Sequence, residues 1–562
     1  MIFSLLFYFT LVIISLPLFA GTDVLTAHTD NARTGLIETE TVLNRSNVRA
    51  ATFGKVCSTP VDGQIYAEPL VVSNVDFVGS QAPLDVVYVA TMNDSVYAIN
   101  AADCSVLRKV SLVPVAGGCI QGKTCEQPVQ CAHVGGGGCA TISPIIGILS
   151  TPVIKMPGPN DTGPGTLYLV AETQVGADNS ISAWYHRLHA LQLDTLSERA
   201  DSPIVIGGDY MGRQFVSKDH VQRPGLLLTG TTSPPGHTLY IAFSLMDGSP
   251  NLPRGWMFGY SADLLTPQPP GLPYVFTTTP TGVSPSGPGG GIWQGGAGLA
   301  YGADSANSSS SFLFFGTGDG TFDAFHGGPN YADTFLKLTP NLQVDAYFTR
   351  SNEFKLPVDT DYGSGGVLLI PPNVVASHPY LAVNGSKDGN IYVVDRAHPG
   401  GYNASRNTNV ETITGTGVYH DAPAFFNQHV YIAPVAGPIS SFRVSDTCNP
   451  GPLCTPPDAI GKVNFKYGAT PSISWNGTDL KTAIVWGLWT PGQPSGGTAA
   501  VLYAFTADTL STIYSANSCP VRDAAGLGVK FSVPTVANGR VYVGTQTELD
   551  VYGLLKPGSV CQ

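Results

Sequence analysis

Several polar residues precede short apolar runs, in a pattern that recurs along the chain: Glu68, Arg223, Gln294, His420, Asp421 and Lys530. Brought together, both charge signs, an imidazole and an amide would form a small-molecule site. His420 beside Asp421 has the chemistry of a general acid and base, although adjacent strand residues point to opposite faces. The competing interpretation is a solvated surface on which ion pairs satisfy the charges.

Trp293 and Gln294 stand where other copies of the recurring pattern carry proline. A large flat ring at such a place can stack on a planar ligand. An aromatic residue that belongs to the core is the competing interpretation. We therefore include Trp293 and Gln294, with Glu68, Arg223 and Lys530, among the candidate ligand-binding residues.

Two short acidic segments carry oxygen ligands. Asp319 and Asp323 lie in GDGTFDAF, and Asp359 and Asp361 lie in DTDYGSGG. Carboxylates two to four residues apart in glycine-rich loops can hold calcium, so calcium is the candidate metal. Neither segment matches the twelve-residue calcium loop, and Asp and Gly are also ordinary turn residues.

The number of cysteines is even, which behind a signal peptide predicts disulfides: Cys57, Cys104, Cys119, Cys125, Cys131, Cys139, Cys448, Cys454, Cys519 and Cys561. Cys448 and Cys454 flank a proline-rich turn and can close a small loop. The cluster from Cys119 to Cys139 contains His133, so zinc is the alternative there, although the spacing is loose for a structural zinc site.

The apolar residues 2–19, followed by Ala20 and polar sequence, predict a signal peptide over 1–20 and a secreted protein. An uncleaved anchor is the alternative, because no Lys or Arg precedes the apolar run. Periplasmic or cell-surface residence stays open. No later segment is long and apolar enough to span a membrane. The net charge of −12 without a Lys/Arg cluster argues against a nucleic-acid partner.

The elements that must position these residues are repeated strands. A proline-led apolar run, a turn, an alternating strand, a second turn and a third strand recur eight times, most clearly from Val533 to Leu555. Asn-Gly and Asp-Gly turns suit tight hairpins. We expect an all-β, single eight-bladed propeller over residues 21–562, closed by a strand over 51–61. The expected blades are 62–110, 143–200, 217–265, 274–340, 345–398, 410–446, 460–510 and 512–555.

Seven blades with one irregular insertion are the alternative to eight. In a propeller, the innermost strand of each blade lines a central channel. The polar residues that begin each proline-led run would then gather around one mouth of that channel. His28, Asp30 and Arg33 could cap the channel, but we expect them to tie down the terminus.

The phrases VYVATMNDSVYAINA and VLYAFTADTLSTIYS resemble the repeat of the pyrroloquinoline-quinone-type, or quinoprotein alcohol dehydrogenase-like, eight-bladed propellers. So do HTDNARTG at His28, VDGQIYAEPL at Val61 and GTGDGTFDAFHGGPNYADTFLKL at Gly316. The resemblance covers nearly all of the chain after residue 20. The chain is similar in particular to secreted quinoprotein-like propellers of unassigned activity.

This resemblance implies pyrroloquinoline quinone and calcium as cofactors. The chain departs from the catalytic members in having no adjacent Cys-Cys pair, no Trp at the ends of its repeats and no placeable calcium set. Because fold does not fix activity, we expect a monomeric binding or scaffold propeller for a small molecule, glycan or extracellular protein. The alternative is a quinone- and calcium-dependent oxidoreductase of alcohols or sugars. A hydrolase or lyase acting on extracellular polymers is a third possibility.

Overall fold

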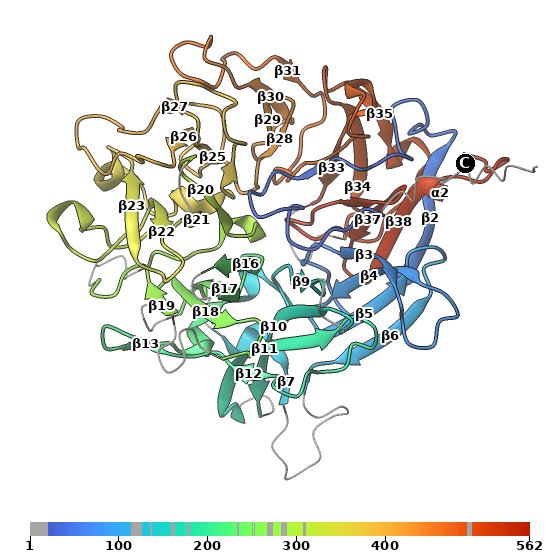
Figure 1. Ribbon diagram of the computed structural model, residues 1–562, viewed down its shortest axis with the longest axis horizontal. Coiled ribbons are helices and arrows are strands. Elements are labelled where there is room, and N and C mark those ends of the chain that lie inside the picture. Colours follow the sequence, from blue (N-terminus) through green and yellow to red (C-terminus); the bar gives the residue numbers. More distant parts are fainter. Residues whose placement is uncertain are drawn as a thin grey trace, which may run out of the picture.

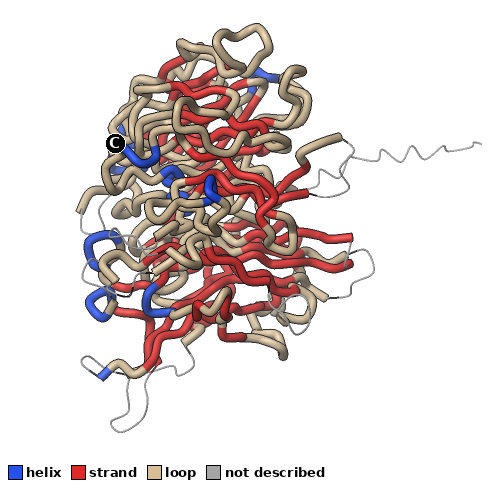
Figure 2. The backbone as a smooth tube through the Cα atoms, turned by 90° about the vertical axis from the view of Figure 1, so that its left-hand side faces the viewer, coloured by secondary structure: helices blue, strands red, loops and turns tan. Residues whose placement is uncertain are grey.

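Short apolar strands separated by tight turns build the fold, as the sequence predicts. The computed structural model describes residues 21–113, 126–134, 138–158, 163–176, 180–232, 235–249, 251, 253–266, 274–282, 289–306, 311–491 and 497–561. Eight antiparallel sheets follow one another around a central axis, with the chain running from blue to red around the ring (Figure 1). Figure 2 shows the ring from the side, with its few short helices in blue.

The first four blades each contain a meander of four strands. Their strands are β3 (Leu70–Val75), β4 (Leu84–Ala90), β5 (Ser95–Asn100) and β6 (Val106–Ser111); β9 (Val153–Lys155), β10 (Thr166–Val175), β11 (Ala183–Gln192) and β12 (Ile204–Val205); β16 (Leu227–Thr232), β17 (Pro235–Leu245), β18 (Trp256–Ser261) and β19 (Tyr274–Thr277); β20 (Ala300–Ala303), β21 (Ser311–Gly316), β22 (Thr334–Leu338) and β23 (Val344–Thr349).

The last four blades follow the same plan. Their strands are β24 (Leu368–Leu369), β25 (Leu381–Gly385), β26 (Ile391–Asp395) and β27 (Glu411–Ile413); β28 (Ala424–Phe426), β29 (His429–Ile432), β30 (Ser440–Arg443) and β31 (Ala459–Ile460); β32 (Ser472–Ser474), β33 (Ile484–Trp489), β34 (Val501–Thr506) and β35 (Thr512–Ser515); β36 (Thr535–Ala537), β37 (Arg540–Gly544), β38 (Glu548–Leu554) and β2 (Phe53–Pro60).

The remaining elements are short additions to the ring. They are the strands β1 (Leu36–Ile37), β7 (Glu126–Gln130), β8 (Ile145–Ile146), β13 (Asp209–Tyr210), β14 (Arg213–Gln214) and β15 (His220–Val221), the α-helices α1 (Gly138–Thr141) and α2 (Pro520–Asp523), and 3₁₀ turns that include η4 (Gln294–Gly296) and η7 (Tyr362–Ser364). The described residues therefore contain very little helix, and the expected all-β class is confirmed.

The ring closes through its N-terminal strand. β2 pairs antiparallel with β38, so a strand from the start of the chain becomes the outer strand of the eighth blade (Figure 1). Phe53 in β2 packs against Trp486 at 5.6 Å and Tyr514 at 4.9 Å between ring centroids, within a core that joins the seventh and eighth blades. Both the eight-blade count and the closing strand are confirmed, and the seven-blade alternative is wrong.

The expected limits of individual blades need correction. β19, β23 and β27 pair with the third strands of the third, fourth and fifth blades, whereas the expected limits assign them to the following blade. Outer strands alternate less cleanly than inner ones because they lie at the rim and are partly exposed, as the burial of β6 and β3 shows. They also follow loops of variable length, so the repeat does not fix their position.

An N-terminal segment, residues 21–37, runs around the axis against the inner strands. Its backbone carbonyls accept hydrogen bonds from the N–H groups of inner-strand residues in six blades: Val71, Ile154, Tyr301, Leu369, Phe425 and Ile473. The Asn31 side chain donates to Leu228 O of the third blade at 2.9 Å, and Thr22 N donates to Asn538 Oδ1 of the eighth at 2.7 Å. This segment therefore links all eight blades.

Most blade faces are buried against their neighbours. One apolar cluster joins the second and third blades through residues such as Leu188 and Phe258, and others repeat this arrangement around the ring. The Asn538-Gly539 turn between β36 and β37 has φ of 50° and 75°, the conformation of a tight hairpin that favours these two residues.

Four disulfides join described cysteines: Cys57–Cys104, Cys131–Cys139, Cys448–Cys454 and Cys519–Cys561. The small loop expected for Cys448 and Cys454 is confirmed. Because Cys131 and Cys139 are bonded to each other, neither is available as a zinc thiolate. Cys119 and Cys125 lie outside the described residues, as does the expected signal segment 1–20. Within the described chain, no helix is long and apolar enough to cross a membrane.

Candidate functional site

The meander brings the loops before each inner strand to one face of the ring. The loop between the second and third strands of a blade reaches the same face, because the second strand runs antiparallel to the first. Arg223, Trp293, His420 and Lys530 lie ahead of β16, β20, β28 and β36. Lys387 follows β25, the second strand of its blade. Residues far apart in sequence therefore meet at one end of the channel.

A cavity of about 500 Å³ occupies this face. Its volume falls within the range of small-ligand pockets. Its polar and aromatic lining comes from nine loops: Arg223, Asp247, Trp293, Asp319, Asp359, Asp361, Lys387, His420, Tyr467, Lys530 and Phe531. Four residues predicted from the repeat to surround the channel mouth, or to stack on a ligand there, line this one cavity: Arg223, Trp293, His420 and Lys530.

Trp293 presents its ring to the cavity. Its Nε1 donates a 2.7 Å hydrogen bond to Asp361 Oδ2, which fixes the orientation of the indole. Lys387 Nζ lies 4.9 Å, and the Arg223 guanidinium carbon 5.5 Å, from the ring centroid, both within cation–π distance. The following turn is held tightly, because a Cβ on Gly295 would lie 1.7 Å from the His420 carbonyl oxygen. Trp293 is thus half-buried in a rigid wall of the cavity.

Two cations in the cavity have no acidic contact. Among the described residues, no carboxylate oxygen lies within 4.0 Å of the Arg223 guanidinium or of Lys530 Nζ; every recorded ion pair involves other residues. Arg223 Nη2 is buried without a hydrogen-bond partner. Burial lowers the pKa of Arg223, and burial together with Arg223 lowers the pKa of Lys530 to about 7. An anion entering the cavity would stabilise both charges.

His420 and Asp421 are adjacent in the loop before β28, but their side chains lie in different environments. His420 lines the cavity at 5.9 Å from the Trp293 ring, whereas Asp421 is 3% exposed, outside the cavity wall, and accepts a 3.3 Å hydrogen bond from Thr470 Oγ1. Burial, together with the positive charges of Lys387 and Arg223, lowers the pKa of His420 to about 4. His420 is therefore a neutral imidazole near neutral pH, and the structure does not bring the two together as an acid–base pair.

Three carboxylates approach one another beside Trp293. One oxygen each of Asp319, Asp333 and Asp361 lies within 4.8 Å of the others. Burial and the carboxylates of Asp333 and Asp361 raise the pKa of Asp319 to about 8. Arg350 contacts Asp333 at 3.0 Å and Lys387 contacts Asp361 at 3.4 Å, so two cations already offset part of this charge. A divalent cation would relieve the remaining repulsion through oxygen ligands.

The other calcium candidates have different positions. Asp323 accepts hydrogen bonds from the backbone and side-chain nitrogens of Asn330 at 2.9 and 2.6 Å, which stabilise its own turn. Asp359 has a side chain that is 79% exposed and contacts Lys387 Nζ. The structure therefore brings Asp319 and Asp361 together, adds Asp333 to them, and leaves Asp323 outside.

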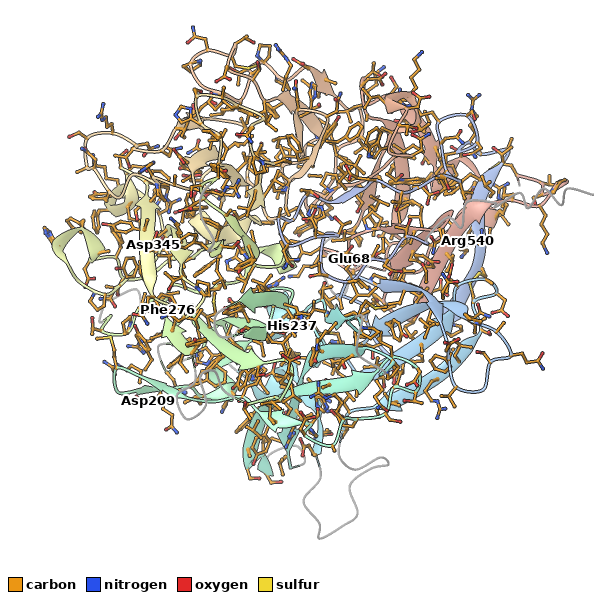
Figure 3. The ribbon with its side chains drawn as sticks, viewed as in Figure 1. Glu68, Asp209, His237, Phe276, Asp345 and Arg540 are labelled. Atoms are coloured by element: carbon orange, nitrogen blue, oxygen red, sulfur yellow. A yellow bond between two sulfur atoms is a disulfide. The ribbon has the colours of Figure 1, made fainter. Side chains whose placement is uncertain are left out.

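Glu68 and Gln294 lie deeper than the cavity. Glu68 borders a narrow space of about 20 Å³ that Arg223 also lines, and its Oε2 accepts a 2.7 Å hydrogen bond from His28 N. Figure 3 shows Glu68 close to the middle of the ring, far from the rim residues Asp209 and Asp345. Gln294 is fully buried, and its Oε1 accepts a hydrogen bond from Gly316 N at 3.2 Å. Neither side chain lines the cavity of about 500 Å³.

Sequence reasoning did not identify Asp247, Lys387, Phe531 or Asp333 as part of the site. Lys387 lies in the hairpin turn SKDGN, which carries the signature of an ordinary turn. The blade topology could have indicated Lys387, because the turn after the second strand of a blade lies on the same face as the loop before the first strand. Asp333 is a turn residue with φ of 49°, and its carboxylate is buried against Arg350.

No protein-family model matches the chain, and no curated protein matches it. Several solved structures match the chain. The europium-containing methanol dehydrogenase matches with a TM-score of 0.53 at 12% identity over 95% of this chain and 98% of that one. The quinohemoprotein alcohol dehydrogenase from Comamonas testosteroni matches with a TM-score of 0.53 at 14% identity, covering 96% and 82%.

These likenesses define the class of the protein as a single eight-bladed β-propeller. More narrowly, its fold is similar to that of these two dehydrogenases, in line with the resemblance seen in the sequence. At 12% and 14% identity the likeness is one of fold, and the chemistry has to be argued from the side chains.

Proposed function

We propose that the protein binds a small, flat, anionic molecule in the cavity at the end of the channel. The observation that carries this proposal is the pairing of an aromatic wall, Trp293, with two cations that lack acidic contacts, Arg223 and Lys530. A buried cation without a counterion is costly, and carboxylate or phosphate groups of a ligand would offset that cost. The cavity's volume of about 500 Å³ favours a small ligand over a glycan chain or a protein partner.

Binding is tested with pyrroloquinoline quinone, a flat polycarboxylate, in the presence and absence of millimolar calcium. Because a ligand that binds only the folded state stabilises it by mass action, about 2.7 kcal/mol at one hundred times Kd, the melting temperature should rise with quinone concentration. Arg223→Gln should weaken binding at least tenfold while the chain stays folded. An unchanged melting temperature and unchanged quinone absorbance at saturating concentrations would refute the proposal for this ligand.

A second candidate function is a quinone- and calcium-dependent oxidoreductase of alcohols or sugars. The observation that favours it is the cluster of Asp319, Asp333 and Asp361 in and beside the same cavity wall. These carboxylates fit a calcium ion, and a bound quinone would supply the two-electron acceptor for oxidation of a hydroxyl group. The chain lacks the adjacent cysteine pair of the superfamily's alcohol dehydrogenases, so we place binding before catalysis.

Catalysis is tested by adding quinone, calcium and an electron-accepting dye to the protein with ethanol or glucose as substrate. The oxidoreductase candidate predicts dye reduction that requires both additions and decreases at least a hundredfold in Asp319→Asn. Saturable quinone binding without dye reduction across a panel of alcohols and sugars would support the binding function and refute the enzymatic one.

We also propose that the protein acts outside the cytoplasm, where its disulfides are stable.

A further inference from the structure

Lys530 differs from the other lysine of the cavity, Lys387, in being buried without a hydrogen bond or an ion pair to any described residue. It lies in the loop before β36, is 8% exposed, and lines the cavity together with Arg223 and His420. Its Nζ is 5.6 Å from the Phe531 ring, and among the described residues no hydrogen bond or ion pair engages it. The positive charge of Arg223 lowers the pKa of Lys530, and the smaller effect of Asp247 raises it. The amine thus faces the proposed ligand without a partner.

Lys387 provides the contrast within the same cavity. Its Nζ contacts the carboxylates of Asp359 and Asp361. Burial acts to lower the pKa of Lys387, but these two carboxylates outweigh burial and raise it, so this amine stays a charged ammonium. Lys530 instead has a pKa of about 7 because of burial and Arg223. A sizeable fraction of Lys530 is therefore a neutral, nucleophilic amine at neutral pH.

We propose that Lys530 captures carbonyl compounds as a covalent imine, so that the ligand class of the cavity includes flat anionic aldehydes and activated ketones. This inference rests on the proposed ligand-binding function of the cavity. The neutral amine adds to the carbonyl carbon and forms a C–N bond, and a proton moves from nitrogen to oxygen. Loss of water, which carries away the carbonyl oxygen and both amine hydrogens, leaves the C=N bond. No oxidant or reductant is required.

The remaining groups around Lys530 suit this step. Arg223 and Lys387 supply positive charge for the anionic part of the ligand, and Trp293 supplies a flat surface for its ring. His420 is neutral, so it does not add a further positive charge beside the reacting amine.

The test uses pyridoxal 5′-phosphate, which has a flat ring, an anionic phosphate and an aldehyde. The protein is incubated with the probe, reduced with borohydride, digested and mapped by mass spectrometry. We expect Lys530 to carry at least ten times more label than any other lysine, with a labelling rate that rises to a plateau through about pH 7. Lys530→Arg, which keeps the charge, should abolish the site-specific label, whereas Lys481→Arg, at an exposed lysine outside the cavity lining, should retain it on Lys530.

Pyridoxine 5′-phosphate, which lacks the aldehyde, separates this inference from the function on which it rests. If it binds saturably but the aldehyde probe is not trapped on Lys530, the imine proposal is overturned and ligand binding stands. If neither compound nor pyrroloquinoline quinone binds, both proposals fall. Lys530→Met provides a second variant, and because Lys530 has no ion pair to lose, both variants should fold with an unchanged melting temperature.

Discussion

Several ionisable side chains near the ring axis are held in environments that disfavour their charged forms. Glu68 and Asp421 are both nearly inaccessible to solvent, and burial raises their pKa values to about 7 and about 8. Asp421 Oδ2 is buried without a hydrogen-bond partner. These carboxyl groups are protonated over part of the neutral range, so the stability of the ring should depend on pH through them.

Asp421→Asn tests this linkage. Because the folded-state pKa of Asp421 lies above its ordinary value of 3.8, the stabilising contribution of its proton is complete below about pH 4 and is lost as the pH rises toward 8. The amide does not ionise. Between pH 5 and pH 8 the variant should gain at least about 1 kcal/mol in free energy of unfolding relative to the parent protein. Urea unfolding at both pH values measures the difference, and parallel pH profiles would contradict it.

Part of the candidate site could be predicted from residue types and their place in the repeat. Arg223, His420 and Lys530 precede inner strands in three copies of one pattern, so a ring topology brings them together. Which of the neighbouring residues faces the cavity could not be predicted, because Gln294 and Asp421 precede inner strands in the same way and are buried elsewhere. That choice depends on the local backbone, including the φ of 44° at Gln294.

At the scale of elements, the N-terminal segment 21–37 holds the inner strands in place. Its backbone carbonyls pair with inner strands around the ring, and backbone pairing leaves no signature in side-chain patterns. The cluster His28, Asp30 and Arg33 was open to two interpretations, capping the channel or tying down the terminus. Arg33 is fully buried, and its Nε and Nη1 donate to Leu299 O at 2.8 Å and Ala27 O at 2.7 Å.

Arg33→Met should therefore destabilise the ring. The change removes charge-assisted hydrogen bonds and leaves buried carbonyl acceptors unsatisfied, at a cost of about 2–3 kcal/mol. Arg443→Met is the matched control, because Arg443 and Asp458 form a pair whose side chains are 43% and 41% exposed, and losing such a pair costs less than about 1 kcal/mol. Equal unfolding free energies for the two variants would show that Arg33 does not hold the segment.

At the scale of the whole molecule, closure is the property that the sequence predicted best. Eight copies of one pattern, and a strand left over before the first copy, require a ring whose last blade is completed from the start of the chain. β2 and β38 form that pair. The outer strands were misassigned because they are partly exposed and weakly patterned, whereas the inner strands carry the proline-led apolar runs that recur most clearly.

The disulfide Cys57–Cys104 fastens the closing strand to the first blade. In the chain-entropy model, removing it by a double substitution to serine should cost about 4 kcal/mol, because it spans 47 residues. The same change at Cys448–Cys454, which spans 6 residues, should cost about 2 kcal/mol. Equilibrium urea unfolding of both double variants gives the comparison. A larger loss for the short loop would mean that closure contributes little to the stability of the ring.

The central claim is that the cavity bounded by Trp293, Arg223 and Lys530 is a ligand site. A structure of the protein determined with saturating pyrroloquinoline quinone and calcium tests it most directly. We predict density for a flat molecule against Trp293, with its carboxylates toward Arg223 and Lys530, and none at this position in Trp293→Ala under the same conditions. An empty cavity at saturating quinone, or quinone bound only elsewhere on the ring, would contradict the claim.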